Sequence, residues 1–197
     1  MKIIDSGMPD ETYWNSLFDI PLIVNWLDLT SATAPIVEIG CGYGTFTVPI
    51  ARAATTDVYA FDIESSMIET AQKNTRQAGI RNVRFYLRDI IEEGTGLESG
   101  SAGMVLLFNI LHFGGRRILL EQASRLLKPN GVVAIVHWRK DIETPRGPSV
   151  HLRPDQDMIL DSVRGLDLSF NGSGAILRPY HWGIQLIKEI KHFKETA

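Results

Sequence analysis

Three glycines at alternate positions follow a glutamate in the segment Glu38-Ile39-Gly40-Cys41-Gly42-Tyr43-Gly44. Glycine has no Cβ, so the backbone there can turn sharply and a ligand can approach it closely. The Gly-x-Gly-x-Gly spacing differs from the Gly-x-Gly-x-x-Gly fingerprint of dinucleotide-binding folds, and the absence of a lysine after the glycines excludes a Walker-type phosphate loop. Because Glu38 adds a carboxylate, the loop favours a cationic ligand, and a tight turn without any ligand is the alternative.

Two more acids stand at the ends of short apolar runs. Asp62 follows Gly44 by 18 residues, and an acid at that place can accept hydrogen bonds from both ribose hydroxyls of an adenosine. Asp89 can accept a hydrogen bond from the amino group of adenine, while the backbone N–H of Ile90 donates to the ring. The alternatives are a helix N-cap for Asp62 and a solvated loop acid for Asp89.

The elements that must position these residues alternate along the chain. Runs that are apolar at every position are typical of strands covered on both faces, and Arg84 in the third run places that strand nearer a sheet edge. Helix-period segments between the runs predict right-handed crossovers, and therefore a doubly wound α/β domain. The five strand-length runs are 35–39, 57–61, 82–87, 104–108 and 132–136.

Local signals predict where the helices begin and end. Ser66 and Glu69 have the spacing of a capping box, and Gly79 stands where a C-terminal cap is expected. A second apolar stripe begins at Ile118, and the Lys-Pro-Asn-Gly segment at 128–131 predicts a turn into the fifth strand.

The two ends of the chain have a different pattern. Segment 11–30 predicts one amphipathic helix, whose Tyr13 and Trp14 either pack on the core or close over the ligand as a lid. Beyond the fifth strand, an irregular loop is expected at 141–154 and a short helix at 155–164. Two antiparallel strands are expected at 166–170 and 181–188, joined by the glycine-containing segment 171–174.

In this combination the chain resembles the class I S-adenosylmethionine-dependent methyltransferases. The resemblance covers about residues 35–138. It rests on the glycine loop, Asp62, the Asp89-Ile90 pair, the segment Asn109-Ile110-Leu111-His112 and the Leu-Leu-Lys-Pro-Asn-Gly segment at 126–131. The combination is much more specific than any one of these motifs.

The resemblance implies a three-layer, mostly parallel sheet with an antiparallel C-terminal strand, S-adenosylmethionine as cofactor and S-adenosylhomocysteine as product. It implies a single domain with an N-terminal helical cap (1–34), a cofactor-binding core (35–138) and a C-terminal part (139–197). The glycines would line the methionine part, Asp62 would hold the ribose, and the residues after it would flank adenine. The expected cofactor-binding residues are Glu38, Gly40, Cys41, Gly42, Gly44, Asp62, Ile63, Met67, Asp89, Ile90, Phe108 and Asn109, and no metal ligand is expected.

Methyl transfer from a sulfonium is an in-line displacement, which needs alignment and a dry pocket. A base is needed only if the acceptor must lose a proton. His112 is the best-placed candidate and Tyr43 the second, while Tyr180 and His181 are weaker. A packing or capping role is the alternative for His112.

Motif differences favour a small-molecule acceptor. The fourth strand is not followed by the Asn/Asp-Pro-Pro-Tyr run of amino-methylating enzymes, and a single cysteine, Cys41, argues against arsenite methylation. The Leu111-His112 ending resembles small-molecule methyltransferases. Arg146 or Arg153, in a basic loop after the fifth strand, would steer an anionic acceptor, and a merely solvated loop is the alternative.

The 197 residues, 44% hydrophobic, fit one globular domain. A net charge of −3 argues against nucleic acid as a partner. The sequence contains neither a signal-peptide pattern nor a run that could span a bilayer, so a cytoplasmic protein without a membrane partner is expected. Two other functions stay open: a nicotinamide-dependent oxidoreductase, disfavoured by the glycine spacing, and a module that binds S-adenosylmethionine without transferring its methyl group.

Overall fold

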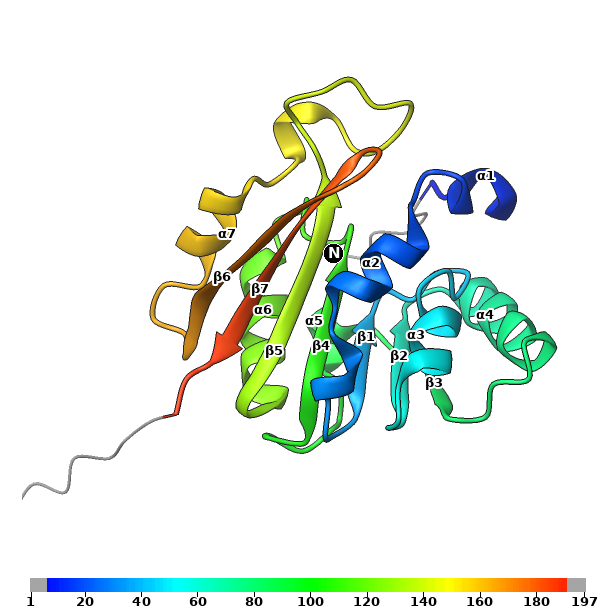
Figure 1. Cartoon of the computed structure of the whole chain (residues 1–197), viewed down its shortest axis with the longest axis horizontal. Helices are drawn as coiled ribbons and strands as arrows, with labels where there is room; N and C mark the ends of the chain where they lie inside the picture. Colours follow the sequence, from blue (N-terminus) through cyan, green and yellow to red (C-terminus); the bar gives the residue numbers. More distant parts are fainter. Residues whose placement is uncertain (1–6, 191–197) are drawn as a thin grey trace, which may run out of the picture.

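The computed structural model describes residues 7–190, apart from the side chains of Ser31, Asn171 and Ser173. Within these residues a seven-stranded sheet has the order β3-β2-β1-β4-β5-β7-β6 (Figure 1). Strands β1 to β5 pair in parallel, whereas β7 runs antiparallel to both β5 and β6. The strands are β1 (Ile36–Ile39), β2 (Val58–Asp62), β3 (Val83–Leu87), β4 (Ala102–Phe108), β5 (Leu127–Trp138), β6 (Leu168–Leu177) and β7 (His181–Lys188).

Helices cover both faces of the sheet, with α2 and α3 on one face and α5 and α6 on the other (Figure 1). The helices are α1 (Glu11–Asn15), α2 (Ile20–Trp26), α3 (Thr47–Ala53), α4 (Ser65–Gln77), α5 (Ile90–Glu93), α6 (Arg116–Leu126) and α7 (Gln156–Ser162), with 3-10 turns η1 (Leu29–Ser31) and η2 (Val150–Leu152). No helix within residues 7–190 is long and apolar enough to cross a membrane. The predicted doubly wound, three-layer α/β fold is confirmed, and β3 is an edge strand as Arg84 indicates.

The sheet is apolar on both sides because successive strand residues enter different cores. Val105 and Leu107 pack with α5 and α6, whereas Met104 and Leu106 pack with α2 and α3. Every residue of β4 is buried. This explains why the central strands read as continuous apolar runs.

The single helix predicted over 11–30 is wrong. The chain forms two short helices there, because Asp19 caps a new helix by accepting a hydrogen bond from the backbone N–H of Leu22, and Pro21 occupies its first turn. Trp14 packs edge-on against Phe18, with ring centroids 4.9 Å apart, so this ring belongs to the core contacts of the segment.

Two details of the other helices also differ from prediction. Helix α4 begins two residues earlier than the capping box requires, with Glu64 at the N-cap, so Ser66 lies inside the helix and caps nothing. Gly79 does end this helix, at φ +71°. In α6 the buried positions include Leu119 and Leu120, while Ile118 is 39% exposed.

Two predicted turns are irregular parts of longer strands. Segment 128–131 lies inside β5, where the pairing with β4 shifts register between Ala102 and Met104 and Asn130 adopts φ +62°. Segment 171–174 lies inside β6, with a register shift between Phe170 and Gly174. In both cases a bulge accommodates the turn-forming residues while the strand continues to pair.

Candidate functional site

The glycine loop connects β1 to α3 at the carboxyl edge of the sheet. The backbone N–H groups of Gly40 and Cys41 both donate to the carbonyl of Phe61, at 2.8 and 2.9 Å, which ties the loop to the end of β2. Gly40 has φ +80°, and a Cβ there would lie 2.8 Å from Cγ2 of Ile110. The first glycine is therefore required by backbone conformation and by the segment that follows β4.

The other two glycines of the loop have different surroundings. Gly42 has φ +52°, and its N–H donates to Oδ2 of Asp62 at 2.8 Å. Gly44 has φ +80°, and a Cβ there would lie 3.2 Å from Cβ of Ala71 on α4. The third glycine thus permits the loop to pack closely on a helix.

Asp62 is held in place by the backbone at the end of β2. Besides the bond from Gly42, its Oδ1 accepts a hydrogen bond from the N–H of Glu64 at 3.0 Å. Burial raises the pKa of this carboxyl, and these backbone hydrogen bonds oppose that rise. The side chain is therefore fixed, partly buried and directed at the middle of the glycine loop.

Glu38 is the most deeply buried acid of the site. It is 1% exposed, and Oγ1 of Thr47 donates to its Oε2 at 2.5 Å. Burial raises its pKa to about 8, and the neighbouring Asp62 carboxylate adds to the rise. Two acids close together in a low-dielectric site create a demand for positive charge, which fits the cationic ligand expected from the sequence.

Cys41 lies within the glycine loop, and Ile63 and Met67 are the residues predicted to flank adenine. The Cys41 thiol packs in a small apolar cluster with Ala60 and Ile68, and burial raises its pKa, so the thiol is protonated and is a core group. Ile63 is 37% exposed, directly after Asp62. Met67 is half-buried in the first turn of α4. The latter two leave an apolar surface open beside Asp62.

Asp89 and Ile90 have structural roles in the chain. Oδ1 of Asp89 accepts hydrogen bonds from the N–H groups of Ile91 and Glu92, at 3.0 and 3.4 Å, and so caps α5. The Ile90 side chain is buried in the core against α6. Asp89 is thus a helix cap in the segment after β3, and its contact with adenine stays a prediction.

Phe108 and Asn109 end β4 at the same edge. The Phe108 ring packs against Phe46, with centroids 5.0 Å apart. Because Phe46 is the residue between the glycine loop and α3, this contact supports the end of the loop. Asn109 adopts the left-handed conformation at φ +57°, and its backbone N–H donates to Val136. Neither the Oδ1 nor the Nδ2 of this buried side chain has a hydrogen-bond partner. A strained backbone and an unpartnered amide point to a ligand here.

His112 lies near a second histidine, His137, that no sequence motif singles out. Its ring centroid is 5.7 Å from that of His137, which is fully buried at the end of β5. Burial lowers the pKa of His112, so its imidazole is neutral at pH 7 and can accept a proton. His137 has no hydrogen-bond partner at either ring nitrogen, and burial holds its pKa well below the usual range.

Tyr43 connects the glycine loop to the N-terminal segment. Its hydroxyl donates to the carbonyl of Pro9 at 2.7 Å, and its own carbonyl accepts a hydrogen bond from Asn74 on α4. Burial raises the pKa of the Tyr43 phenol. The phenol proton is already used within the protein, so the geometry gives this residue a positioning task.

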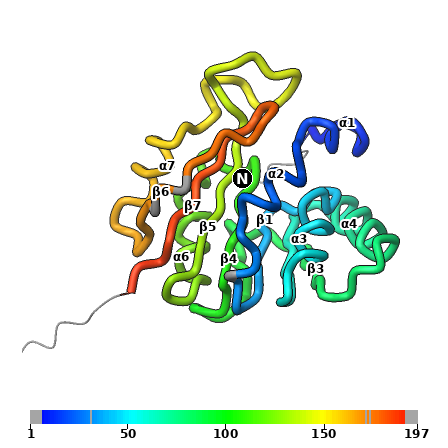
Figure 2. The backbone as a smooth tube through the Cα atoms, viewed as in Figure 1, coloured from blue at the N-terminus to red at the C-terminus, as the bar shows by residue number. Residues whose placement is uncertain are grey.

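The basic loop 139–155 extends past the carboxyl ends of the strands (Figure 2). Arg153 is buried and donates to the carbonyls of Pro148, Arg139 and Arg146, so it organises the loop from within. Steering of an acceptor by Arg153 is therefore wrong, because its guanidinium is committed to the backbone. His181 is likewise a core residue, packed on Phe18 with ring centroids 4.4 Å apart.

His137 was not predicted because its importance depends on residues that are distant in the sequence. A polar residue inside the run Val136-His137-Trp138 is the one available signal. Its neighbours are His112, from the segment after β4, and Trp182, its cross-strand partner on β7. Among residues 7–190, however, no three His, Cys, Asp or Glu side chains gather closely enough to hold a metal ion.

The chain belongs to the methyltransferase domain family, whose model matches residues 30–169. A SAM-dependent methyltransferase from Aquifex aeolicus has a similar structure, with a TM-score of 0.77 over 91% of this chain and 94% of its own, at 19% identity. Magnesium protoporphyrin IX methyltransferase from Synechocystis PCC 6803, solved with bound SAM, has a TM-score of 0.68 over 95% and 88%, at 16% identity. The predicted class I methyltransferase fold is confirmed.

Sequence relatives include enzymes that act on RNA. The chain is 32% identical over 84 residues to the 23S rRNA (uracil(1939)-C(5))-methyltransferase RlmD of Aeromonas hydrophila, covering 43% of this chain and 19% of that protein. It is 28% identical over 134 residues to the human tRNA N(3)-cytidine methyltransferase METTL2B, covering 64% and 35%. The chain thus spans about a fifth to a third of the length of these relatives.

These relatives correct the expectation of a small-molecule acceptor with nucleic acid excluded. That exclusion rested on the net charge of −3, because a protein that binds many backbone phosphates usually carries an excess of positive charge. Recognition of one extruded base depends instead on stacking and on hydrogen bonds to the base edge. Net charge therefore does not decide between the two classes of acceptor.

Proposed function

We propose that this chain is an enzyme that binds S-adenosylmethionine at the glycine loop and transfers its methyl group to an acceptor at the edge formed by Asn109 and His112. The observation that carries the proposal is a pair of acids on either side of the loop, the buried Glu38 and the partly buried Asp62, each fixed by hydrogen bonds. Membership of the methyltransferase domain family supports it.

The residues present fit this cofactor. Asp62 offers a fixed carboxylate to the ribose hydroxyls, and the exposed faces of Ile63 and Met67 offer apolar contact to adenine. The carboxylate of Asp62 suits the ammonium and sulfonium groups of the methionine part, and a bound cation would favour the ionised form of the Glu38 carboxyl, whose pKa is about 8 without a ligand. The unpartnered amide of Asn109 supplies a donor and an acceptor at the same edge.

The cofactor supplies an electrophilic methyl group, and the chain supplies alignment and proton handling. The loop and Asn109 hold the reacting groups in line, which accounts for most of the advantage in a displacement of this kind. His112, neutral at pH 7, accepts a proton when the acceptor must lose one. Location in the cytoplasm stays a prediction.

Calorimetry with S-adenosylhomocysteine tests the cofactor site. Asp62→Ala should weaken binding by about 1.5–3 kcal/mol, or about 10- to 150-fold, since charged hydrogen bonds and the anchor of Gly42 are lost. Asp57→Ala is the matched control, because Asp57 precedes the same strand and makes only an exposed ion pair with Arg84. It should bind as the parent does.

Two results would count against the proposal. Equal affinity of the parent and Asp62→Ala for S-adenosylhomocysteine would show that Asp62 does not bind the ribose. Heat from NADH in place of S-adenosylhomocysteine would favour the nicotinamide-dependent oxidoreductase that the glycine spacing disfavours.

A further inference from the structure

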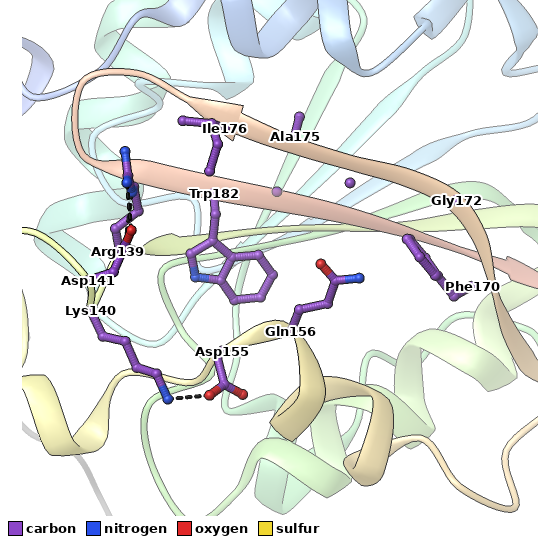
Figure 3. Close-up of a pocket in the computed structure, with 12 residues that line it drawn as sticks. Arg139, Lys140, Asp141, Asp155, Gln156, Phe170, Gly172, Ala175, Ile176 and Trp182 are labelled. Atoms are coloured by element: carbon purple, nitrogen blue, oxygen red, sulfur yellow. Dashed lines mark hydrogen bonds and ion pairs between the residues drawn. The ribbon is translucent and has the colours of Figure 1, made fainter.

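A cavity of about 460 Å³ lies outside the glycine-loop site, between the start of loop 139–155, the start of α7 and the β6–β7 hairpin (Figure 3). Its lining includes Trp182, Ile176 and Phe170 from the hairpin and Gln156 from α7. None of these residues has a task in binding the cofactor. The cavity is therefore available to another ligand.

The floor of this cavity is aromatic and apolar. The indole of Trp182 lies in the middle of the lining residues, with Ile176 at one side (Figure 3). Ile176 and Trp182 are cross-strand partners on β6 and β7. Ile176 is 55% exposed and Phe170 39% exposed, which is costly for large apolar side chains. A planar ring stacked on the indole would cover this surface.

The polar groups around the floor have a neutral balance. The Gln156 amide lies beside the indole (Figure 3), and it carries both donors and an acceptor. Lys140 pairs with Asp155, and Arg139 makes two bonds to Asp141, at 3.0 and 2.6 Å. Because these cations are already paired, the cavity suits a neutral ring with hydrogen-bonding edges better than an anion.

Trp182 links the cavity lining to the strand β5 that leads to the proposed methyl-transfer edge. Trp182 is the register partner of His137, so the two side chains lie on the same face of the sheet. His137 is in turn 5.7 Å from His112, ring to ring. His137 is fully buried with both nitrogens unpartnered, and Asn109, directly after β4 and bonded through its N–H to Val136, has an unpartnered amide. Buried groups of this kind call for a polar partner, and the sheet register places His137 directly beside Trp182 of the cavity lining.

We propose that this cavity binds a nucleobase of the methyl acceptor, stacked on Trp182 and hydrogen-bonded to Gln156. The base belongs either to an RNA strand or to a free nucleotide. This inference rests on the proposed function for its link to methyl transfer, since the cavity holds a part of the acceptor. A nucleobase combines the planar face that the indole fits with the donor and acceptor edge that an amide recognises.

Binding of a short unstructured RNA oligonucleotide and of UMP, each with saturating S-adenosylhomocysteine, tests this inference. Saturating S-adenosylhomocysteine occupies the cofactor site, so the measured binding of RNA or UMP does not include a base bound at that site. Trp182→Leu should weaken binding about tenfold or more, since stacking on one aromatic ring is lost, while Trp182→Phe should keep most of it. Trp26→Leu is the matched control, because the Trp26 indole packs on the opposite face of β7, against Gly183.

The affinity for S-adenosylhomocysteine, measured for every variant, reports folding and separates the two proposals. Unchanged RNA and UMP binding in Trp182→Leu would overturn the cavity assignment, as would a parent that binds S-adenosylhomocysteine but neither RNA nor UMP. Failure to bind S-adenosylhomocysteine would overturn the proposed function instead. Binding of the oligonucleotide alone, lost in Trp182→Leu, supports an RNA strand as the carrier, and equal binding of UMP supports a free nucleotide.

Discussion

Burial of Glu38 couples the stability of the cofactor-free chain to pH. Its pKa of about 8 lies above the value of 4.5 for an exposed glutamate, so the folded state holds an extra proton between these values. The stabilisation is complete below about pH 4.5 and is lost as the pH rises through about 8. The shift corresponds to about 4–5 kcal/mol of unfolding free energy.

Glu38→Gln keeps the shape of the side chain and removes the titration. Urea unfolding at about pH 5 and about pH 8 should show a smaller loss of stability in this variant than in the parent, by a few kcal/mol. The Thr47 hydroxyl can still donate to the amide oxygen, so the fold should persist. An equal pH dependence in both proteins would contradict the burial argument.

His112 separates catalysis from cofactor binding. Its ring packs beside His137, and it does not hold the glycine loop or Asp62 in place, so His112→Ala should leave the affinity for S-adenosylhomocysteine nearly unchanged. If the acceptor must lose a proton, turnover should fall about 100-fold or more, the usual contribution of a general base. The parent should also show an acid limb below pH 6.5, since burial lowers the His112 pKa, and the variant should lack it. Equal turnover would reduce His112 to packing.

At the scale of elements, the loop between β1 and α3 depends on contacts from the segment after β4. Gly40→Ala adds a Cβ at a positive φ and only 2.8 Å from Ile110. Gly100→Ala has a similar φ of +73°, with nothing within 4 Å, so it measures the backbone cost alone. We expect a loss of about 1 kcal/mol for Gly100→Ala and about 1–3 kcal/mol more for Gly40→Ala, from urea unfolding. Equal losses would show that Ile110 moves aside freely.

The strands could be predicted from the sequence because their buried side chains form continuous apolar runs. The helix start and the turns could not, because several nearby residues can play the same local role. Val105 and Leu107 are apolar because each face of β4 meets a different helix layer, and that pattern is visible in the chain. Ser66 has the spacing of an N-cap residue, yet the N-cap of α4 is Glu64. Asn130 and its neighbours resemble a turn, yet pairing with β4 continues through a bulge.

The candidate site was predictable where one segment carries it and hidden where several segments meet. The proximity of the glycine loop to Asp62 could be predicted from the sequence, because the two follow strands that pair side by side. His137 and Trp182 acquire their proposed importance from pairing between β5 and β7 and from the segment after β4. Cross-strand neighbours of this kind are set by tertiary structure.

For the whole molecule, a balance of charge summed over the chain hides the local chemistry. Net charge is −3, yet the glycine-loop site brings together the buried Glu38 and the partly buried Asp62, and the cavity beside Trp182 has its cations paired with acids. The central claim is that methyl transfer from S-adenosylmethionine depends on the glycine-loop site, whatever the acceptor.

Incubation of the chain with methyl-labelled S-adenosylmethionine and two separate pools, total RNA and a metabolite extract, tests that claim most directly. We predict label in one of the pools, lost with Asp62→Ala and retained with Asp57→Ala. No transfer to either pool, or equal transfer by the parent and Asp62→Ala, would contradict it.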